Sequence, residues 1–226
     1  MLKGNEGTSL MEQAYAQLRR EIITCKLRPG SDISESELAE RLEMSKTPIR
    51  EALARLRIDG FVMAYPRRGY RIAPVTLSDM NELFDVRVIL EGGVAALAAE
   101  SLTSEQFDEL EKLADVTYDL LVEDSIDAFI LSNRRFHTAI AVGAGRPRLV
   151  NLISKNLDEL ERFFYIGAIL RDVSPETKDG HHAIVKTLRQ RDPDAARDIL
   201  VAHNMSTRDG LLSVIASGRS SQIGII

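Results

Sequence analysis

The 226-residue chain has one cysteine and no tryptophan, and aromatic residues make up only 5% of it. A single cysteine, Cys25, cannot form an intramolecular disulfide, which indicates a reducing compartment. The longest uncharged runs, such as 92–99 and 163–170, are much shorter than the roughly 18 apolar residues that a membrane span needs. Residues 1–9 are polar and do not resemble a signal peptide, so they are interpreted as a flexible tail. These absences predict a cytoplasmic protein without a membrane segment.

Charge is distributed unevenly along the chain, although its overall composition is that of an ordinary globular protein. Hydrophobic residues account for 44% and charged residues for 28%, and the length suits one large domain or two smaller ones. Residues 1–74 contain 13 Lys and Arg against 10 Asp and Glu, whereas residues 75–226 contain 16 against 24. Only the N-terminal part has the positive charge that attracts phosphate, so nucleic acid is expected to bind there.

Residues 34–59 predict two short helices joined by a tight turn. Ser34 and Glu37 have the spacing of a capping box, and Ser45 is placed to cap the second helix. Gly60 predicts the end of that helix. The spacing of its apolar residues predicts one buried stripe, made of Ile49, Ala52, Leu53 and Leu56. A further helix over 10–25 is expected to pack beneath it.

Two strand-like runs, 61–65 and 70–75, follow the second helix and are separated by four turn residues, two of them arginines. They predict a β-hairpin with a basic tip. With the two helices, this hairpin predicts a winged helix-turn-helix domain over 10–74. The alternative for the charged residues of the second helix is a solvated face, but the turn, the cap and the hairpin favour binding to double-stranded DNA.

The predicted DNA contacts lie at the start of the second helix and at the hairpin tip. Arg50 is the candidate for a two-pronged contact with a guanine, because its planar fork matches O6 and N7. The others are expected to contact phosphates, the edge of the major groove or the minor groove. The predicted DNA-contacting residues are Ser45, Lys46, Thr47, Arg50, Arg68 and Gly69.

After a hinge at 74–76, helical periodicity continues to residue 217 and predicts an all-α antiparallel bundle over 78–217, followed by a tail at 218–226. Ser78 and Ser104 are expected to cap the first two helices, and later helices are expected at 125–143, 147–170, 174–191 and 193–217. The pair Gly92-Gly93 lies inside the first helix, where glycine is unfavourable. Close packing, room for a ligand and simple tolerance are three explanations for it.

The segment 34–75 resembles the winged helix-turn-helix of the GntR superfamily, in the FadR branch whose C-terminal half is an all-helical FCD domain that binds ligands. The resemblance implies a transcription regulator rather than an enzyme, acting as a homodimer on a palindromic operator. Two residues depart from the family's usual sequence. Glu43 stands where the family usually has glycine, which predicts mild strain if the backbone there needs a positive φ. Ser36 stands where the family often has arginine.

The resemblance also implies a metal site in the helical domain. His137, His182 and His203 occupy positions at which the family places metal-binding histidines, and His181 is interpreted as a neighbouring or exposed residue. The family has an aspartate four residues before the first histidine, where this chain has Asn133. Its amide oxygen is an acceptable but uncharged ligand. Three imidazoles favour Zn²⁺ or Ni²⁺, with Mn²⁺ or Fe²⁺ where supply decides. The alternative is a set of hydrogen-bonded core histidines.

Arg87 matches a family position that often holds a ligand carboxylate, and Arg134 is a second candidate for that role. The alternative for Arg87 is a surface ion pair with Asp85, Glu91 or a partner subunit. The sequence therefore predicts a metabolite-responsive repressor that senses a small organic acid at a metal-centred pocket. Two other hypotheses are a regulator with a metal-free pocket and a metal-dependent hydrolase-like enzyme. The enzyme lacks support because no acidic residue accompanies the histidines in an HExxH arrangement.

Overall fold

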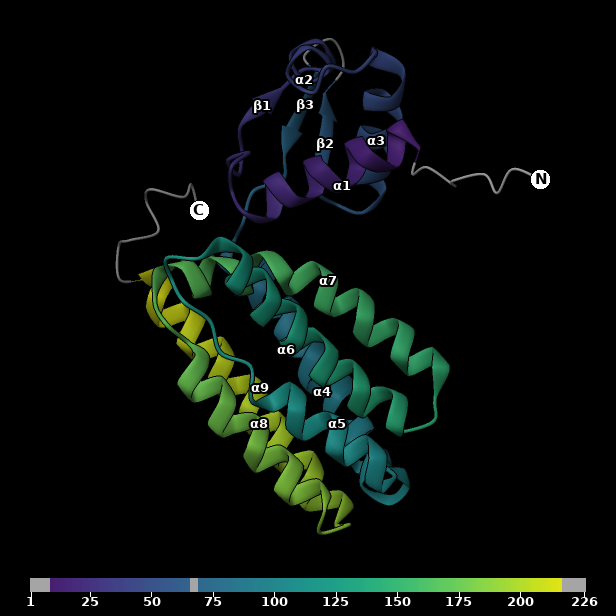
Figure 1. The fold of residues 1–226 in the computed structure, drawn as a ribbon, viewed down its shortest axis with the longest axis vertical. Helices are drawn as coiled ribbons and strands as arrows, with labels where there is room; N and C mark the ends of the chain where they lie inside the picture. Colours follow the sequence, from purple (N-terminus) through teal and green to yellow (C-terminus); the bar gives the residue numbers. More distant parts are fainter. Residues whose placement is uncertain (1–8, 66–68, 217–226) are drawn as a thin grey trace, which may run out of the picture. The chain divides into compact units, whose positions relative to one another are not determined.

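A computed structural model describes residues 9–65 and 69–216, and the chain divides between Val75 and Thr76 into two compact units (Figure 1). The first is a winged helix-turn-helix and the second is a bundle of helices only, so the predicted fold class is confirmed. Arg68, most of the predicted N-terminal tail and the predicted C-terminal tail lie outside the described residues.

The N-terminal unit combines three helices with a small sheet. Its elements are α1 (Leu10–Ile23), β1 (Asp32–Ile33), α2 (Glu35–Arg41), α3 (Lys46–Ile58), β2 (Val62–Tyr65) and β3 (Gly69–Ile72). The sheet has the order β1-β3-β2 with both pairs antiparallel, and Ile33 lies opposite Tyr70. The two residues of β1, which the sequence indicates only as an extended link, thus complete the wing as its third strand.

The buried stripe of α3 is confirmed, because its four predicted residues are fully buried. They pack against Ala14, Leu18 and Ile22 of α1, which are also fully buried. The capping box at α2 is confirmed as well: the Ser34 Oγ accepts from the Glu37 N–H at 3.2 Å, and Glu37 Oε2 accepts from the Ser34 N–H at 3.1 Å. Ser45 occupies the N-cap position of α3, but its side chain makes no capping hydrogen bond.

Residues with positive φ shape several turns of this unit. Glu43, between α2 and α3, has φ 53°, so the condition under which mild strain is predicted for a non-glycine residue here is met. Gly60 follows α3 with φ 81°, as a helix-ending glycine does. Gly69 has φ 87°, and a Cβ there would lie 2.8 Å from the Ile33 carbonyl oxygen. Glycine is therefore required at residue 69 by the packing of β3 on β1.

The C-terminal unit consists of α4 (Leu77–Ser101), α5 (Ser104–Ala114), α6 (Glu123–Gly143), α7 (Pro147–Leu170), α8 (Ser174–Leu188) and α9 (Pro193–Ala216). Helix α4 packs along α9 and also contacts α6 and α7. The predicted caps of its first two helices are wrong by one or two residues. Thr76 caps α4, since its Oγ1 accepts from the Asp79 N–H at 3.1 Å, and Thr103 caps α5 in a capping box with Gln106. Each threonine has the extended backbone that a cap requires.

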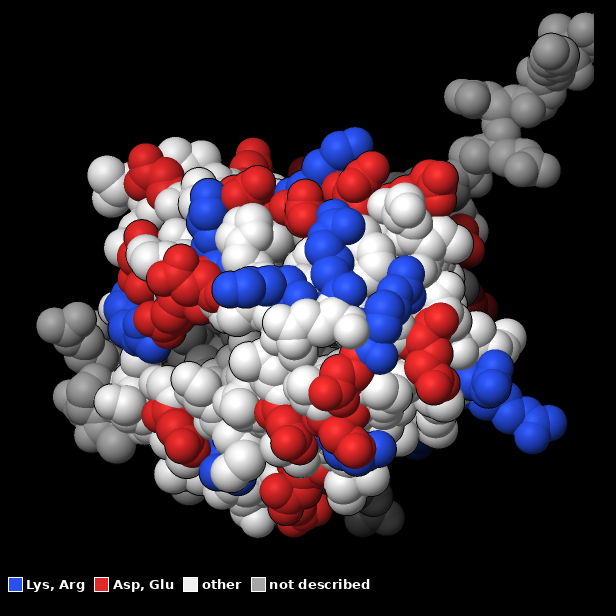
Figure 2. Space-filling view, turned by 90° about the horizontal axis from the view of Figure 1, so that it is seen from below, with Lys and Arg blue, Asp and Glu red and all other residues white. Residues whose placement is uncertain are grey.

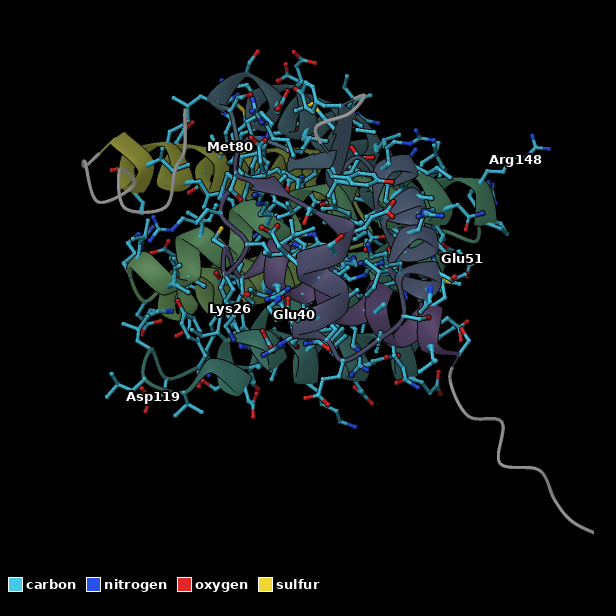
Figure 3. All side chains as sticks on the ribbon, turned by 90° about the horizontal axis from the view of Figure 1, so that it is seen from above. Lys26, Glu40, Glu51, Met80, Asp119 and Arg148 are labelled. Atoms are coloured by element: carbon cyan, nitrogen blue, oxygen red, sulfur yellow. The ribbon has the colours of Figure 1, made fainter. Side chains whose placement is uncertain are left out.

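One apolar core holds the bundle together, with buried side chains from α4, α5, α6, α7, α8 and α9. The charged side chains of Asp119 and Arg148 lie at the surface, as Figure 3 shows, whereas Arg87, Glu91 and Arg162 are buried. On the face drawn in Figure 2, acidic and basic side chains are interspersed. None of the helices in the described ranges is long and apolar enough to cross a membrane.

Candidate DNA-reading surface and histidine site

The N-terminal end of α3 presents the predicted DNA contacts as one exposed group. Ser45, Lys46, Thr47 and Arg50 are all exposed, while the opposite side of the helix is buried. Arg50 is tied by an ion pair to Glu35 of α2, with 2.8 Å between Nη2 and Oε2. The surface has the form of a reading helix, with polar side chains at the helix start where they reach base edges. DNA contact by these residues and by Gly69 stays a prediction.

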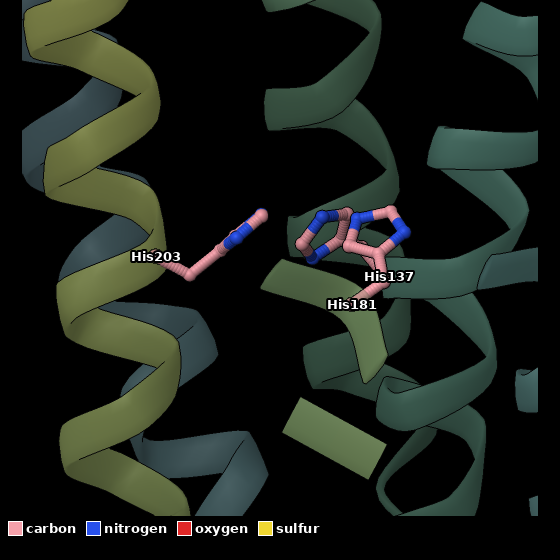
Figure 4. Close-up of side chains that lie close together, drawn as sticks. All are labelled: His137, His181 and His203. Carbon is pink, nitrogen blue, oxygen red and sulfur yellow. The ribbon is translucent and has the colours of Figure 1, made fainter. Parts of the chain in front are cut away.

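Three histidine rings meet inside the C-terminal unit (Figure 4). His137 of α6, His181 of α8 and His203 of α9 each offer a ring nitrogen, and these nitrogens lie within 4.8 Å of one another. The ring centroids are 5.2 to 5.4 Å apart. His181 also stacks on Phe136 at 3.8 Å. A Cβ at residue 180 would lie 2.7 Å from His203 Nδ1, so Gly180 lets the backbone of α8 approach this ring closely.

The predicted ligand His182 is not part of this histidine triad, and His181 takes its place. The side chain of His182 is 40% exposed, and its Nε2 lies 3.0 Å from Asp115 Oδ1. Adjacent residues on a helix point about 100° apart, so only one of the two rings can face the core. A signal for the correct choice was present, since His181 has the i, i+3, i+4 and i+7 spacing with the buried residues Ile184, Val185 and Leu188.

Two buried side chains of opposite charge, Arg87 and Glu91, contact the ring nitrogens of His137. Arg87 Nε donates to Glu91 Oε1 at 3.0 Å, and Glu91 Oε2 lies 2.8 Å from His137 Nδ1 and accepts from Asn204 Nδ2 at 3.1 Å. Arg87 Nη2 lies 2.7 Å from His137 Nε2. Because a guanidinium has no acceptor, Nε2 must be the acceptor in that contact, which leaves the ring proton on Nδ1. His137 is thus oriented by groups of both charges.

Burial sets the protonation of the triad. It lowers the pKa of His137, although the Glu91 carboxylate opposes the shift. Burial and then the charges of the neighbouring rings and Arg87 hold the pKa values of His181 and His203 well below their usual range. Burial alone would raise the pKa of Glu91, but Arg87 and His137 lower it below its ordinary value. The three imidazoles are therefore neutral at pH 7 beside an ionised carboxylate, and neutral rings are the form that binds metals.

Neither predicted carboxylate-binding arginine lines the cavity that lies beside His203. Arg87 is 1% exposed, with its guanidinium 5.7 and 5.3 Å from the ring centroids of Phe84 and Phe164. Its ion pair with Glu91 is the alternative that the sequence leaves open, although it lies in the core rather than at the surface. Arg134 is bound to Asp158. Both guanidinium groups are engaged by carboxylates of the chain itself.

A cavity that is partly open to solvent adjoins the triad through His203. Asn133, the predicted oxygen ligand, lines it together with His203, as do Ser206 and Thr207. The apolar part of its wall includes Phe129, Ile130, Phe164, Leu211 and Val214. Arg171, which the sequence analysis did not single out, lines it too, with its Nη1 2.7 Å from Glu176 Oε2. No pattern in the sequence indicates that Arg171 pairs with Glu176 or that it lines a cavity.

Tyr118 anchors the connection between α5 and α6 to this cavity wall. Its Oη donates to the Arg171 carbonyl oxygen and accepts from the Val173 N–H, both at 2.9 Å. Its ring lies 4.6 Å from that of Phe129. Burial raises the pKa of Tyr118 to about 12. The hydroxyl thus joins residues on both sides of the turn between α7 and α8.

The winged helix-turn-helix and the helical unit with its cavity define a DNA-binding transcription regulator of two domains. Comparison with known families gives the same result. Residues 10–72 match "Bacterial regulatory proteins, gntR family", and residues 82–205 match "FCD domain". The chain belongs to the gntR family and carries an FCD domain.

Relatives along most of the chain are regulators as well. The chain is 28% identical over 211 residues to the uncharacterized HTH-type transcriptional regulator YdhC of Bacillus subtilis, covering 92% of this chain and 94% of YdhC. It is 27% identical over 194 residues to the HTH-type transcriptional repressor RspR of Escherichia coli, covering 85% and 84% of the two chains. The solved structure of Escherichia coli McbR/YncC superposes with a TM-score of 0.69 at 25% identity, covering 92% and 99%.

Proposed function

We propose that this regulator is a homodimeric repressor whose DNA binding is controlled by an organic acid bound in the cavity beside the histidine triad. One observation carries the proposal: three buried, neutral imidazoles lie together, and one of them, His203, also lines the cavity. The name of RspR, a transcriptional repressor, supports repression as the direction of control. Release of the operator by the acid is the response we expect.

The donors of the triad fit a divalent metal ion. Three neutral imidazoles with ring nitrogens within 4.8 Å of one another suit Zn²⁺ or Ni²⁺. Because His137 Nε2 accepts from Arg87 Nη2, an ion bound there would have to displace that guanidinium from the ring nitrogen. The buried His181 Nε2 has no hydrogen-bond partner among the described residues, and a buried polar atom without a partner is unfavourable. A metal ion would satisfy that nitrogen, with the Asn133 amide oxygen as a fourth donor. When bound, the ion would offer open coordination positions to a carboxylate.

The cavity wall indicates an acid with an apolar body. Arg171 is paired with Glu176, so this end of the cavity has no unpaired positive charge to attract an anion. The carboxylate is therefore expected at the other polar region, near Asn133 and His203. Aromatic and aliphatic side chains cover much of the remaining wall, and burying apolar surface there would stabilise the complex.

A thermal-shift screen of carboxylic acids on metal-stripped and metal-loaded protein tests the proposal, because a ligand that binds only the native state raises the melting temperature. We expect Zn²⁺ or Ni²⁺ to stabilise the wild type, and one class of acids to add a further shift only when metal is present. His181→Gln should abolish the shift caused by metal. His182→Gln is the matched control on the adjacent residue and should retain it.

Other outcomes have definite meanings. Equal metal shifts in both variants would contradict the assignment of His181. Shifts caused by acids without metal would favour a metal-free pocket. No shift with any acid would remove the proposed sensing role and leave the DNA-binding regulator.

A further inference from the structure

Arg50, the α3 residue proposed to read a base, is held by a carboxylate from the preceding helix. Its Nε lies 3.1 and 3.0 Å from the two carboxylate oxygens of Glu35, and its Nη2 lies 2.8 Å from Oε2. Glu35 is the first residue of α2, directly after the capping residue Ser34. The capping box of Ser34 and Glu37 therefore fixes the first turn of α2, and Glu35 extends from this turn to Arg50.

Glu35 engages only one of the two edges of the guanidinium that can make a two-pronged hydrogen bond. The engaged edge consists of Nε and Nη2, whereas the outer edge consists of Nη1 and the second hydrogen of Nη2. Within the described part of the chain, no acceptor is hydrogen-bonded to Nη1. The side chain of Arg50 stays 64% exposed, and that of Glu35 is 23% exposed. The outer edge has the geometry that matches guanine O6 and N7.

The wing contributes a third group to this contact. Tyr70 of β3 directs its Oη toward Glu35 Oε1 at 3.5 Å. Hydrogen bonding to Arg50 lowers the pKa of Glu35, so the carboxylate is ionised whenever it holds the guanidinium. Residues of α2, α3 and β3 thus meet around one arginine side chain.

We propose that Glu35 is a positioning residue for base recognition, fixing Arg50 so that its outer edge reads a guanine in each operator half-site. The proposal rests on the reading role proposed for Arg50. A side chain that is already ordered loses less conformational freedom when it binds, which favours the correct base. A carboxylate near DNA also repels phosphate. Glu35 therefore increases sequence discrimination and does not increase general affinity for DNA.

The test uses the full-length protein and a random pool of DNA duplexes, from which the wild type selects its preferred sequence. Affinities of wild type, Glu35→Gln, Arg50→Ala and Asp32→Asn for that sequence and its single-base variants are then measured by fluorescence anisotropy at one salt concentration. Asp32→Asn is the matched control, because Asp32 is an acidic residue of the same unit that binds Arg71 instead, with Oδ1 2.7 Å from Nε. Both changes to an acidic residue remove one negative charge.

We expect wild type to prefer one guanine per half-site by roughly 5- to 150-fold over another base, the range for a two-pronged arginine contact. Arg50→Ala should lose this preference. Glu35→Gln should reduce it by about 2- to 12-fold, the cost of ordering one long side chain on binding, while binding unrelated duplexes at least as tightly as wild type. Asp32→Asn should keep the preference of wild type.

The outcomes separate the positioning role from the reading role. If Arg50→Ala loses the guanine preference and Glu35→Gln retains it, Arg50 reads the base without help and the proposal is overturned. If Arg50→Ala retains the preference, the reading role itself is wrong. Equal losses in Glu35→Gln and Asp32→Asn would indicate a general charge effect, which also overturns the proposal.

Discussion

At the scale of single residues, the hydroxyl of Tyr118 is expected to contribute to stability. It joins the Arg171 carbonyl and the Val173 N–H, so Tyr118→Phe leaves two partly buried backbone groups without their partner. We expect the variant to be less stable at pH 8 by about 1–3 kcal/mol in urea unfolding.

The same residue gives that difference a pH dependence. Burial raises the pKa of Tyr118 to about 12, above the value of about 10 for an unfolded tyrosine. Below pH 10 the neutral side chain contributes fully; above it the unfolded state loses the proton first, so the contribution is lost as the pH approaches 12. The unfolding free energies of wild type and Tyr118→Phe should therefore converge between pH 10 and 12. Parallel curves would contradict a raised pKa.

The residues of the candidate site could be predicted from the sequence only in part. His137 and His203 were found, but the choice of His182 over His181 depended on which ring faces the core, and helix packing decides that. For Arg87 the sequence leaves open a ligand carboxylate or an ion pair with Glu91, and the fold makes that ion pair in the core. A single sequence does not distinguish a guanidinium that awaits a ligand from one that is already paired in the core.

At the scale of helices, the two glycines Gly92 and Gly93 of α4 have different surroundings. Close packing, room for a ligand and simple tolerance are the three explanations that the sequence leaves open for them. A Cβ at Gly92 would lie 2.9 Å from Val201 Cγ2 and 3.4 Å from Arg197 Cγ, both on α9. A Cβ at Gly93 would meet nothing within 4 Å. The first glycine thus allows close packing of α4 on α9, whereas a Cβ at the second would be free of contacts within the subunit.

We expect opposite effects from alanine at these two positions. Gly92→Ala should lower the free energy of unfolding by about 1–3 kcal/mol through overpacking. Gly93→Ala should raise it by about 0.5–1 kcal/mol, because alanine is the better helix former. Urea unfolding at one protein concentration measures both. Equal changes in the two variants would show that packing on α9 does not distinguish them.

Helix positions were predicted well because apolar periodicity extends over many residues, whereas helix ends depend on one cap. The start and end of α7 match the expected 147–170, since proline and a long apolar stripe indicate them. The α4 cap was assigned to Ser78, but the hydroxyl of Thr76 lies at the residue where the backbone is still extended. Sequence spacing alone does not distinguish Thr76 from Ser78 as the cap of α4.

At the scale of the whole molecule, the proposed homodimer requires an exposed face on the helical unit. On α4, Val86 is 45% and Ile89 is 74% exposed, although Phe84, Arg87 and Glu91 on the other side of this helix are buried. We propose these two residues as part of the contact between two copies. Two linked reading helices bind a palindromic operator far more tightly than one, since the second contact becomes intramolecular.

Ile89→Arg should therefore produce monomers in sedimentation velocity and weaken operator binding by roughly 100-fold or more. Leu121→Arg is the matched control, because Leu121 is 92% exposed on the connection between α5 and α6. It should remain dimeric with the affinity of wild type. A dimer that survives Ile89→Arg would place the contact on another face.

The three histidines come from three helices, and this arrangement bears on how long the native state lasts. An ion held by His137, His181 and His203 would join segments that are far apart along the chain, as a cross-link does. Separating α8 from α6 or α9 would then require at least one bond to the ion to break. The lifetime of the folded unit, seen as its resistance to a protease, would thus depend on the supply of metal in its surroundings.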